Sequence, residues 1–199
     1  MDWIIKTINF YKNNNNFQLV IRVHPAELTG SIPSNQSVLE TLREKNIPLS
    51  KNIFLVGPED KISTYTLCKK SDLILIYGTK MGFEVATFGK PIIAAGEAWV
   101  KNKKISYDPK SKKEYFEMLE RSKEIKISKA RKERALRYAF HYFFRRSIAF
   151  NSFEYAPEKK LHIKFTNNSI ENLINNLDPG LNLVCDGILN DNEFIFKTN

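Results

Sequence analysis

The segment Tyr77-Gly-Thr-Lys-Met-Gly-Phe-Glu84 carries the residue types that most clearly point to chemistry. A short apolar run ends there in a glycine turn, and a helical pattern begins directly afterwards. The free N–H groups and the dipole of a first helical turn attract anions, and Gly78 and Gly82 would let the backbone approach a phosphate closely. Thr79 adds a hydroxyl, and the Glu84 carboxylate suits the hydroxyl pair of a ribose or a sugar. The segment predicts a site for a phosphate-bearing ligand, although a plain glycine turn has the same spacing.

A second candidate is Arg22-Val-His-Pro-Ala-Glu27. His24 falls just past an apolar run, where the carboxyl end of a parallel strand would place it on the same rim as Gly78. Histidine titrates near neutral pH, so this ring could bind a phosphate or act as an acid or base. It could equally be satisfied by a backbone carbonyl. The chain has no HExxH, CxxC or GxSxG pattern, so metalloprotease, zinc-ribbon and hydrolase-elbow chemistry lack support.

Short apolar runs alternate with helical patterns in the first half of the chain. The predicted strands are Phe17–Val23, Ile53–Val56, Leu73–Tyr77 and Pro91–Ala95. The predicted helices are Ser34–Lys45 with Ser34 as its cap, Ile62–Lys70 with Asp60 as its cap, and Thr79–Phe88, which Thr79 caps and Gly89 ends. This alternation is typical of βαβ units. It predicts an α/β fold with a Rossmann-like parallel sheet covered by helices on both faces.

Helical patterns dominate after Asp108. We predict helices at Ser111–Ser122, Ser128–Phe150 and Asn168–Leu177, and Phe194–Phe196 as either an edge strand or a loose end. The chain therefore divides into three predicted parts. Residues 1–16 form a lead-in or interdomain-type helix, residues 17–125 form the Rossmann-like domain, and residues 126–199 form a helical extension and tail.

Composition narrows the class of protein. The 199 residues are 42% hydrophobic and include two cysteines, which excludes a disulfide scaffold and a cysteine-based zinc site. No apolar run approaches the roughly 20 residues that span a bilayer. The first residues lack the basic region and cleavage site of a signal peptide. These features predict a cytoplasmic protein.

The net charge of +9 is concentrated between Lys101 and Arg146, where 16 Lys and Arg face 6 Asp and Glu. Arg145 and Arg146 lie there among the aromatic residues Phe143, Phe144 and Phe150. This mixture predicts either a contact with an anionic membrane surface or a solvated basic face whose aromatics belong to the core. No RNA- or DNA-binding signature is present, so a nucleic-acid partner is not expected.

Together, these motifs resemble the capsular polysaccharide biosynthesis family. They are Arg-x-His-Pro-x-Glu at 22–27, Tyr-Gly-Thr-x-x-Gly-x-Glu at 77–84, Gly-Lys-Pro at 89–91 and Tyr-Asp-Pro at 107–109. The family consists of GT-B-like glycosyltransferases, among them Kdo transferases of capsule lipid linkers. The resemblance covers Leu19 to Leu119 and concerns one half of the two-half GT-B fold. It implies the C-terminal half, which binds the nucleotide-activated sugar.

By this resemblance, His24 would contact the donor phosphates, Gly78 and Thr79 would cradle them, and Glu84 would hold ribose or sugar hydroxyls. Lys80 stands where the family often has a small residue, and either adds charge to the phosphate site or faces solvent. The remaining candidates in the same motifs are Gly82, Arg22, Glu27 and Tyr107. The resemblance implies no metal and no cofactor. The expected substrate is a sugar activated by CMP or UDP.

The resemblance also implies an acceptor-binding half that this sequence does not contain. We therefore expect the chain to act with such a half or with a partner chain, in the cytoplasm and at the inner face of the membrane. Whether the chain is itself an enzyme stays open, with His24 as the candidate catalytic residue. The alternatives are a non-catalytic nucleotide- or phosphosugar-binding module and a sugar-nucleotide epimerase-like domain.

Overall fold

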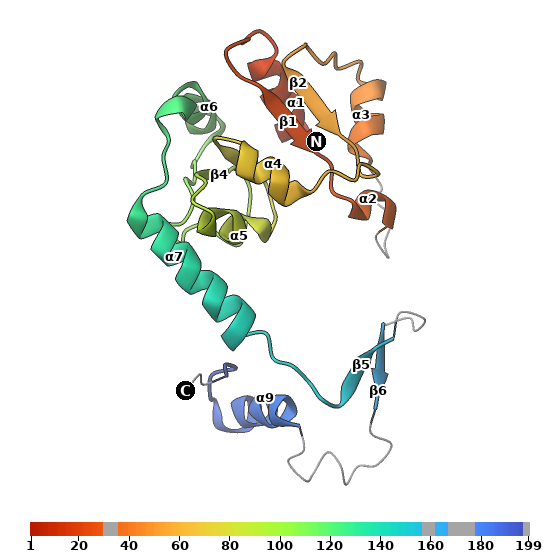
Figure 1. The fold of residues 1–199 in the computed structure, drawn as a ribbon, viewed down its shortest axis with the longest axis vertical. Coiled ribbons are helices and arrows are strands. Elements are labelled where there is room, and N and C mark those ends of the chain that lie inside the picture. The colour runs from red at the N-terminus through yellow and green to blue at the C-terminus, as the bar shows by residue number, and fades with distance from the viewer. Residues whose placement is uncertain (30–35, 157–161, 167–177, 197–199) are drawn as a thin grey trace. The chain divides into compact units, whose positions relative to one another are not determined.

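The computed structural model describes residues 1–29, 36–156, 162–166 and 178–196 of the 199-residue chain. The chain forms two compact units, unit 1 (Met1–Ala135) and unit 2 (Leu136–Asn199). Figure 1 shows their elements in chain order. The division expected from the sequence, into residues 1–16, 17–125 and 126–199, stays a prediction.

Four short strands form the sheets of unit 1. They are β1 (Leu19–Arg22), β2 (Ile53–Val56), β3 (Ile74–Ile76) and β4 (Ile92–Ala94). Each lies within its predicted range, which confirms an α/β fold. β1 pairs with β2 and β3 pairs with β4, both parallel. Among the described residues these are two separate two-stranded sheets, so the continuous sheet expected from the sequence is not seen. Strand pairing is decided by backbone hydrogen bonds between distant segments, which a local pattern does not report.

Helices connect and flank these strands. They are α1 (Asp2–Tyr11), α2 (Ala26–Thr29), α3 (Val38–Glu44), α4 (Thr64–Lys70), α5 (Met81–Thr87), α6 (Lys112–Glu120) and the 3₁₀ turn η1 (Ser122–Glu124). Ser37 caps α3, whereas the predicted cap Ser34 lies outside the described residues. The predicted Asp60 cap is wrong. Its carboxylate instead accepts the Gly57 N–H at 2.6 Å and closes the turn after β2, and α4 begins at Thr64.

One hydrophobic cluster holds unit 1 together, and both sheets contribute to it. Ile8 of α1, Ile93 of β4 and Leu119 of α6 are each completely buried in it. Tyr11 of α1 belongs to the same cluster. Burial raises the pKa of Tyr11 to about 12. Helix α1 is therefore part of this core, and its first turn is fixed relative to the ends of the strands.

The described part of unit 2 differs from the elements that its sequence predicts. Helix α7 (Lys129–Phe140) runs into it and ends in a π-helical turn, η2 (His141–Arg145). A hairpin of β5 (Phe153–Tyr155) and β6 (Ile163–Phe165) and the helix α9 (Pro179–Asn190) follow. The predicted helix Ser128–Phe150 is therefore wrong beyond Arg145, because the Arg146 N–H turns back to the His141 carbonyl.

The end of the chain completes the comparison with the predicted elements. Helix α9 was not predicted, and the whole predicted helix Asn168–Leu177 lies outside the described residues. Phe194–Phe196 is not a strand, and it is not a loose end either, because the Phe196 N–H donates to the Arg145 carbonyl at 2.8 Å. No helix in the described part of the chain is long and apolar enough to cross a membrane.

Asp178 gives unit 2 a testable pH dependence. This buried carboxylate accepts N–H groups from Ser152 at 2.8 Å, Gly180 at 3.1 Å and Leu181 at 3.2 Å, and so caps α9. Burial alone would raise the pKa of Asp178, but the hydrogen bonds from Ser152 and Leu181 outweigh it and lower the pKa to about 2. Because the folded value lies below the unfolded one, the contribution is complete above about pH 4 and is lost toward pH 2.

We expect Asp178→Asn to destabilise α9 by about 1–2 kcal/mol at neutral pH, since the amide is a weaker acceptor for these N–H groups. Urea unfolding followed by circular dichroism, repeated between pH 7 and pH 2, measures the effect. The parent should lose more stability between pH 4 and pH 2 than the variant. Equal losses would contradict this role of Asp178.

Candidate functional site

The carboxyl ends of β3 and β4 lie side by side and form the rim on which the sequence places its main motif. The Ala95 N–H donates to the Ile76 carbonyl at 2.8 Å, which continues the pairing past the strands. Gly96 follows, and a Cβ built on it would lie 2.6 Å from the Tyr77 carbonyl oxygen. Gly96 therefore permits a close approach of the two strand ends. A Cβ on Gly78 would meet only the Glu97 carbonyl at 3.6 Å, an ordinary contact, so the backbone at Gly78 is open.

Helix α5 begins two residues after the predicted start. The Thr79 hydroxyl accepts the Met81 N–H at 3.3 Å, and Lys80 occupies the cap position with its side chain exposed. The helix ends as predicted, with Gly89 at a φ of 84° directly after it. Gly82 is buried, and a Cβ on it would lie 2.7 Å from Ile76 Cδ1. Its missing side chain lets α5 pack closely on β3, and its contact with a phosphate stays a prediction.

His24 is exposed after β1, and its ring orientation is fixed. Its Nδ1 accepts the Ala26 N–H at 3.0 Å, so in the neutral ring the proton resides on Nε2. The partner is thus a backbone N–H rather than the carbonyl that the sequence suggested. In this state Nε2 is available to donate a hydrogen bond to an anion. Within the described residues no hydrogen bond or ion pair joins His24 to Gly78, Thr79 or Glu84, so a shared site for these groups stays a prediction.

Glu84 is oriented by a residue that the sequence did not single out. The Tyr65 hydroxyl of α4 donates to Glu84 Oε2 at 2.5 Å. This hydrogen bond is the main cause of a raised pKa for Tyr65, so the phenol stays protonated and remains a donor. The Glu84 carboxylate is thereby held at the start of α5. Tyr65 is 45% exposed, and no sequence signal marks it.

The three remaining candidates support the backbone in this structure. The Arg22 guanidinium donates to the Gly57 carbonyl and to the Asp60 carbonyl, the latter at 3.2 Å. The Glu27 carboxylate accepts the Val38 N–H at 3.2 Å, at the first residue of α3. The Tyr107 hydroxyl donates to the Lys126 carbonyl at 2.8 Å. Their contact with a ligand stays a prediction.

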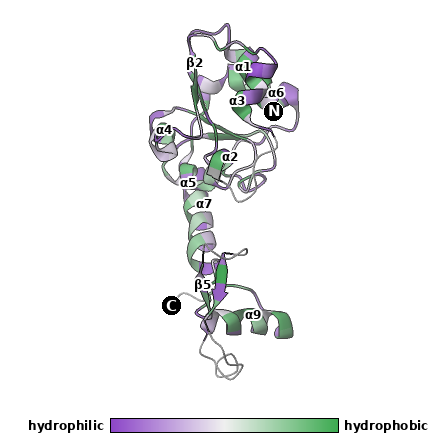
Figure 2. Cartoon of the chain, turned by 90° about the vertical axis from the view of Figure 1, so that its right-hand side faces the viewer, coloured by the Kyte–Doolittle hydropathy of each residue, from purple (hydrophilic) through white to green (hydrophobic). Residues whose placement is uncertain are grey.

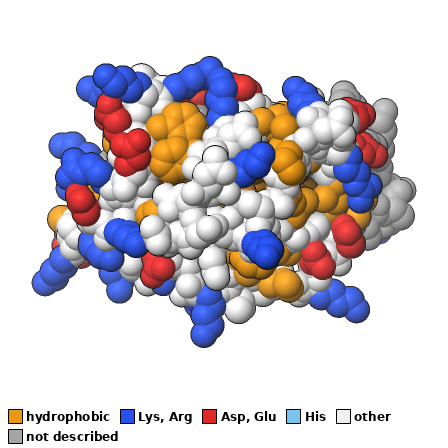
Figure 3. Space-filling model, turned by 90° about the horizontal axis from the view of Figure 1, so that it is seen from above, with side chains coloured by type: hydrophobic (Ala, Val, Ile, Leu, Met, Phe, Trp, Pro, Cys, Tyr) orange, Lys and Arg blue, Asp and Glu red, His pale blue; other side chains and the backbone are white. Residues whose placement is uncertain are grey.

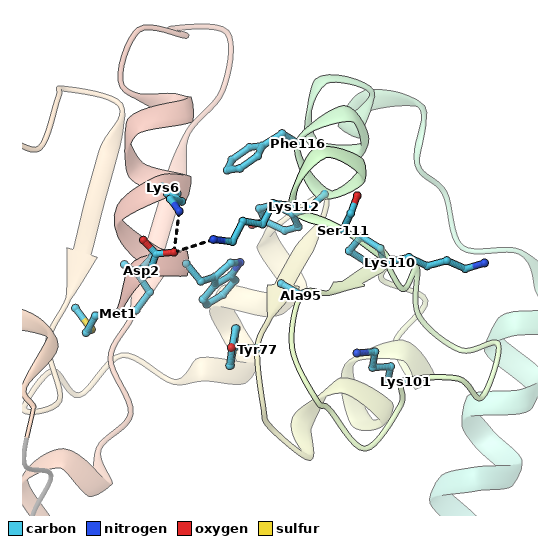
Figure 4. Close-up of a pocket in the computed structure, with 14 residues that line it drawn as sticks. Met1, Asp2, Lys6, Tyr77, Ala95, Lys101, Lys110, Ser111, Lys112 and Phe116 are labelled. Carbon is cyan, nitrogen blue, oxygen red and sulfur yellow. Dashed lines mark hydrogen bonds and ion pairs between the residues drawn. The ribbon is translucent and has the colours of Figure 1, made fainter.

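A cavity of about 560 Å³ opens beside this rim, at the carboxyl ends of β3 and β4. We call it the lysine pocket. It is lined by Met1, Asp2, Trp3, Ile4, Lys6, Tyr77, Ala95, Lys101, Pro109, Lys110, Ser111, Lys112, Tyr115 and Phe116. Figure 4 shows that the lining comes from α1, from the ends of β3 and β4, and from the start of α6. Ligand pockets in proteins commonly have volumes of roughly 300–1,000 Å³, so this one can hold a small organic molecule.

Aromatic rings form much of the apolar wall of the lysine pocket. The Trp3 ring lies 5.5 Å from Tyr77 and 6.5 Å from Tyr115, measured between ring centres. The Tyr115 hydroxyl also forms a 3.0 Å hydrogen bond with Thr7, which fixes α6 to α1. Burial raises the pKa of Tyr115, and the hydrogen bond with Thr7 opposes the shift only in part. The phenol is therefore neutral near pH 7, and the wall carries no negative charge.

Four lysines and one aspartate give the lysine pocket a positive balance. Asp2 forms ion pairs with Lys6 at 2.8 Å and with Lys112 at 3.5 Å, as Figure 4 shows, and Lys101 pairs with Glu97. The Lys110 ammonium forms no ion pair in the described part of the chain. Elsewhere, Lys and Arg side chains are spread over the face seen in Figure 3 rather than gathered into one patch. The combination of a cavity and several ammonium groups favours an anionic ligand at this place.

Sequence reasoning missed most of the lysine pocket. Lys101, Lys110 and Lys112 were noticed only as part of a long basic segment, and the α1 residues carried no signal. The cavity exists because α1 and α6 are brought together, as the Thr7–Tyr115 hydrogen bond records. Among the described residues, no three His, Cys, Asp or Glu side chains gather as a metal site would require.

Comparison with known proteins adds one finding. A family model described as "Capsule polysaccharide biosynthesis protein" matches residues 4–144. This range exceeds half of the chain and includes β1 to β4, α1 from its third residue onward, and the whole lysine pocket except Met1, Asp2 and Trp3. No curated protein and no solved structure matches the chain.

Proposed function

Because the chain belongs to the capsule polysaccharide biosynthesis family, we propose that it binds the nucleotide-activated sugar from which a capsule glycosyltransferase transfers its sugar. In this proposal, unit 1 is the Rossmann-like donor-binding half of a GT-B enzyme. Its two parallel strand pairs then correspond to parts of one doubly wound layer. The acceptor is bound by a second half or by a partner chain.

The lysine pocket is the observation that supports this proposal most directly. Ligands of α/β proteins bind beyond the carboxyl ends of the strands, and the pocket lies beyond β3 and β4. The ammonium groups of Lys110 and Lys112 suit the phosphates of a nucleotide, and the ring wall of Trp3 and Tyr77 suits a flat base or a sugar face. A nucleotide combines these two chemical features in one molecule.

The proposed reaction is the attack of an acceptor hydroxyl on the anomeric carbon of the donor sugar. The bond from that carbon to the phosphate oxygen breaks, and the nucleotide leaves with the electron pair. Negative charge develops on the phosphate oxygen, where lysine ammonium groups and the His24 Nε2–H stabilise it electrostatically. The acceptor proton passes to a base outside the residues assigned here.

A binding module without its own catalysis is the second candidate, and the geometry of His24 favours it. A general base needs a free lone pair, but Nδ1 already accepts the Ala26 N–H and Nε2 carries the proton. In this geometry His24 donates a hydrogen bond rather than accepting a proton. Turnover of any sugar nucleotide by the isolated chain would exclude the non-catalytic candidate.

A thermal-shift panel with CMP, CDP, UDP, GDP and NAD tests the proposed function. A ligand at about 100 times its dissociation constant stabilises the folded protein by roughly 2.7 kcal/mol, which gives a clear shift in Tm. We expect one pyrimidine nucleotide to stabilise the chain selectively. A cooperatively unfolding sample that responds to none of these compounds would contradict donor binding by this chain.

The motif residues provide a separate prediction. We expect His24→Ala and Glu84→Ala each to weaken binding of that nucleotide by about tenfold, since each removes a hydrogen bond to a charged or polyhydroxyl group. Isothermal titration measures the dissociation constants. Tyr65→Phe is the comparison variant, because it removes the hydrogen bond that orients Glu84 but keeps the carboxylate itself, so it should weaken binding less than Glu84→Ala does. If both alanine variants bind like the parent, the motif residues do not contact the nucleotide.

A further inference from the structure

Unit 2 exposes apolar and basic side chains along one short stretch, Leu136–Arg146, which we call the arginine–phenylalanine segment. It consists of the last turn of α7 and the π-helical turn η2. Leu136 is 49% exposed, Phe140 44%, Phe143 45% and Phe144 64%. Phe143 and Phe144 therefore lie outside the core of the described residues, and their burial against a second half stays a prediction. Figure 2 shows hydrophilic and hydrophobic residues together along α7.

Three of the exposed apolar residues share one side of the segment. Leu136, Phe140 and Phe144 follow one another at intervals of four residues, which places them on one side of a helix. The Phe140 and Phe144 rings lie 5.6 Å apart, so they are in contact. Phe143 is in contact with Tyr142, with ring centres 5.1 Å apart. A soluble surface rarely gathers several large apolar side chains in this way without a partner.

The charge of the segment has a single sign. It contains Arg137, Arg145 and Arg146 and no aspartate or glutamate. Arg145 donates to the Phe196 carbonyl at 3.3 Å and interacts with His141, so it serves the structure of unit 2. Arg137 and Arg146 are exposed, and neither forms an ion pair in the described part of the chain. Two cationic side chains therefore border an apolar surface.

We propose that the arginine–phenylalanine segment docks on the surface of an anionic phospholipid bilayer. Phenylalanine and leucine side chains insert at the boundary between headgroups and acyl chains, while arginines at their border bind the lipid phosphates. A nucleic acid fits less well, because the contacting ring pairs already use part of their faces and two exposed arginines neutralise few phosphates. This inference is independent of the nucleotide site, which lies in unit 1.

Co-sedimentation with vesicles tests the proposal on the full chain. One set of vesicles contains phosphatidylcholine alone, and the other contains equal parts of phosphatidylcholine and phosphatidylglycerol. The parent should bind the anionic vesicles preferentially, and added salt should release it. Arg137→Gln with Arg146→Gln should weaken this binding roughly 30-fold, since each basic residue near such a surface contributes about a factor of five. Phe143→Ser with Phe144→Ser should weaken it about tenfold or more.

Two matched controls show whether binding depends on this segment or on exposed charge and exposed apolar residues anywhere in the protein. Lys51→Gln with Lys61→Gln removes two exposed charges from unit 1, and Ile188→Ser with Leu189→Ser removes two exposed apolar residues from α9. Both controls should bind like the parent, and circular dichroism checks that every variant is folded. The proposal is overturned if the parent does not prefer anionic vesicles, if a control loses as much binding as its counterpart, or if single-stranded RNA displaces the vesicles.

Discussion

Replacing Lys110 and Lys112 together with glutamate is expected to weaken nucleotide binding by roughly 30-fold, equivalent to about 2 kcal/mol. Both side chains line the lysine pocket, and the two substitutions turn two positive charges into two negative ones. The local balance of the pocket then changes from positive to negative, and a phosphate-bearing ligand is repelled. Screening by water and salt limits the effect of each exposed charge, so the expected loss of binding free energy stays at about 2 kcal/mol.

The fold should tolerate this double variant. Lys112 is the first residue of α6, where a carboxylate interacts favourably with the helix dipole, and Lys110 is held through its backbone N–H at 2.6 Å from Glu114. Lys51→Glu with Lys61→Glu has the same change in net charge on exposed residues outside the pocket. Titration of all three proteins with the nucleotide from the thermal-shift panel distinguishes local from global charge. If both variants lose the same affinity for the nucleotide, the lysine pocket is not where the nucleotide binds.

This comparison also separates the two parts of the proposed site. If the lysine variant binds normally while His24→Ala and Glu84→Ala do not, the nucleotide lies against the motif residues and outside the pocket. If the lysine variant alone loses binding, the pocket holds the phosphates and the motif residues act on another part of the donor. If all three variants lose nucleotide binding, the nucleotide contacts both the lysine pocket and the motif residues.

Gly96→Ala is expected to destabilise unit 1 by about 2–4 kcal/mol. The added Cβ would lie 2.6 Å from the Tyr77 carbonyl oxygen and 2.8 Å from the Tyr77 ring. Backbone cannot move aside as a flexible side chain can, and the hydrogen bond from Ala95 to Ile76 holds the two strand ends together. The strain must therefore separate β3 from β4 or displace Tyr77, which lines the lysine pocket.

Gly78→Ala is the matched control on the opposite strand end. Its Cβ would meet the Glu97 carbonyl at 3.6 Å, and Gly78 does not have a positive φ, so alanine fits. We expect this variant to be as stable as the parent or more stable by a few tenths of a kcal/mol. Urea unfolding of both variants measures the difference, and equal stabilities would contradict the close approach at Gly96. Gly78→Ala also tests the phosphate cradle, because any loss of nucleotide binding then occurs in a stable protein.

Local sequence patterns predicted which segments are buried and where turns lie. The apolar runs located β1 to β4, and Gly89 marked the end of α5 because only glycine adopts a φ of 84° without strain. The motifs at residues 22–27 and 77–84 indicated the family, which the match over residues 4–144 confirms. The sequence did not identify every helix cap, since Ser63 rather than the predicted Asp60 precedes α4. Several nearby polar residues can accept the same N–H groups, and the backbone path decides among them.

The sequence by itself therefore determined the α/β class, the positions of the four strands along unit 1 and the family. Only the tertiary structure decided that the strands pair in two separate sheets, that α1 closes one side of a pocket, and that Tyr65 orients Glu84. It also decided that Phe140, Phe143 and Phe144 are exposed rather than buried. The physical reason is the range of the interactions. Hydrophobic periodicity and turn chemistry act between neighbouring residues, whereas a pocket or an exposed face depends on which distant segments exclude water from each other.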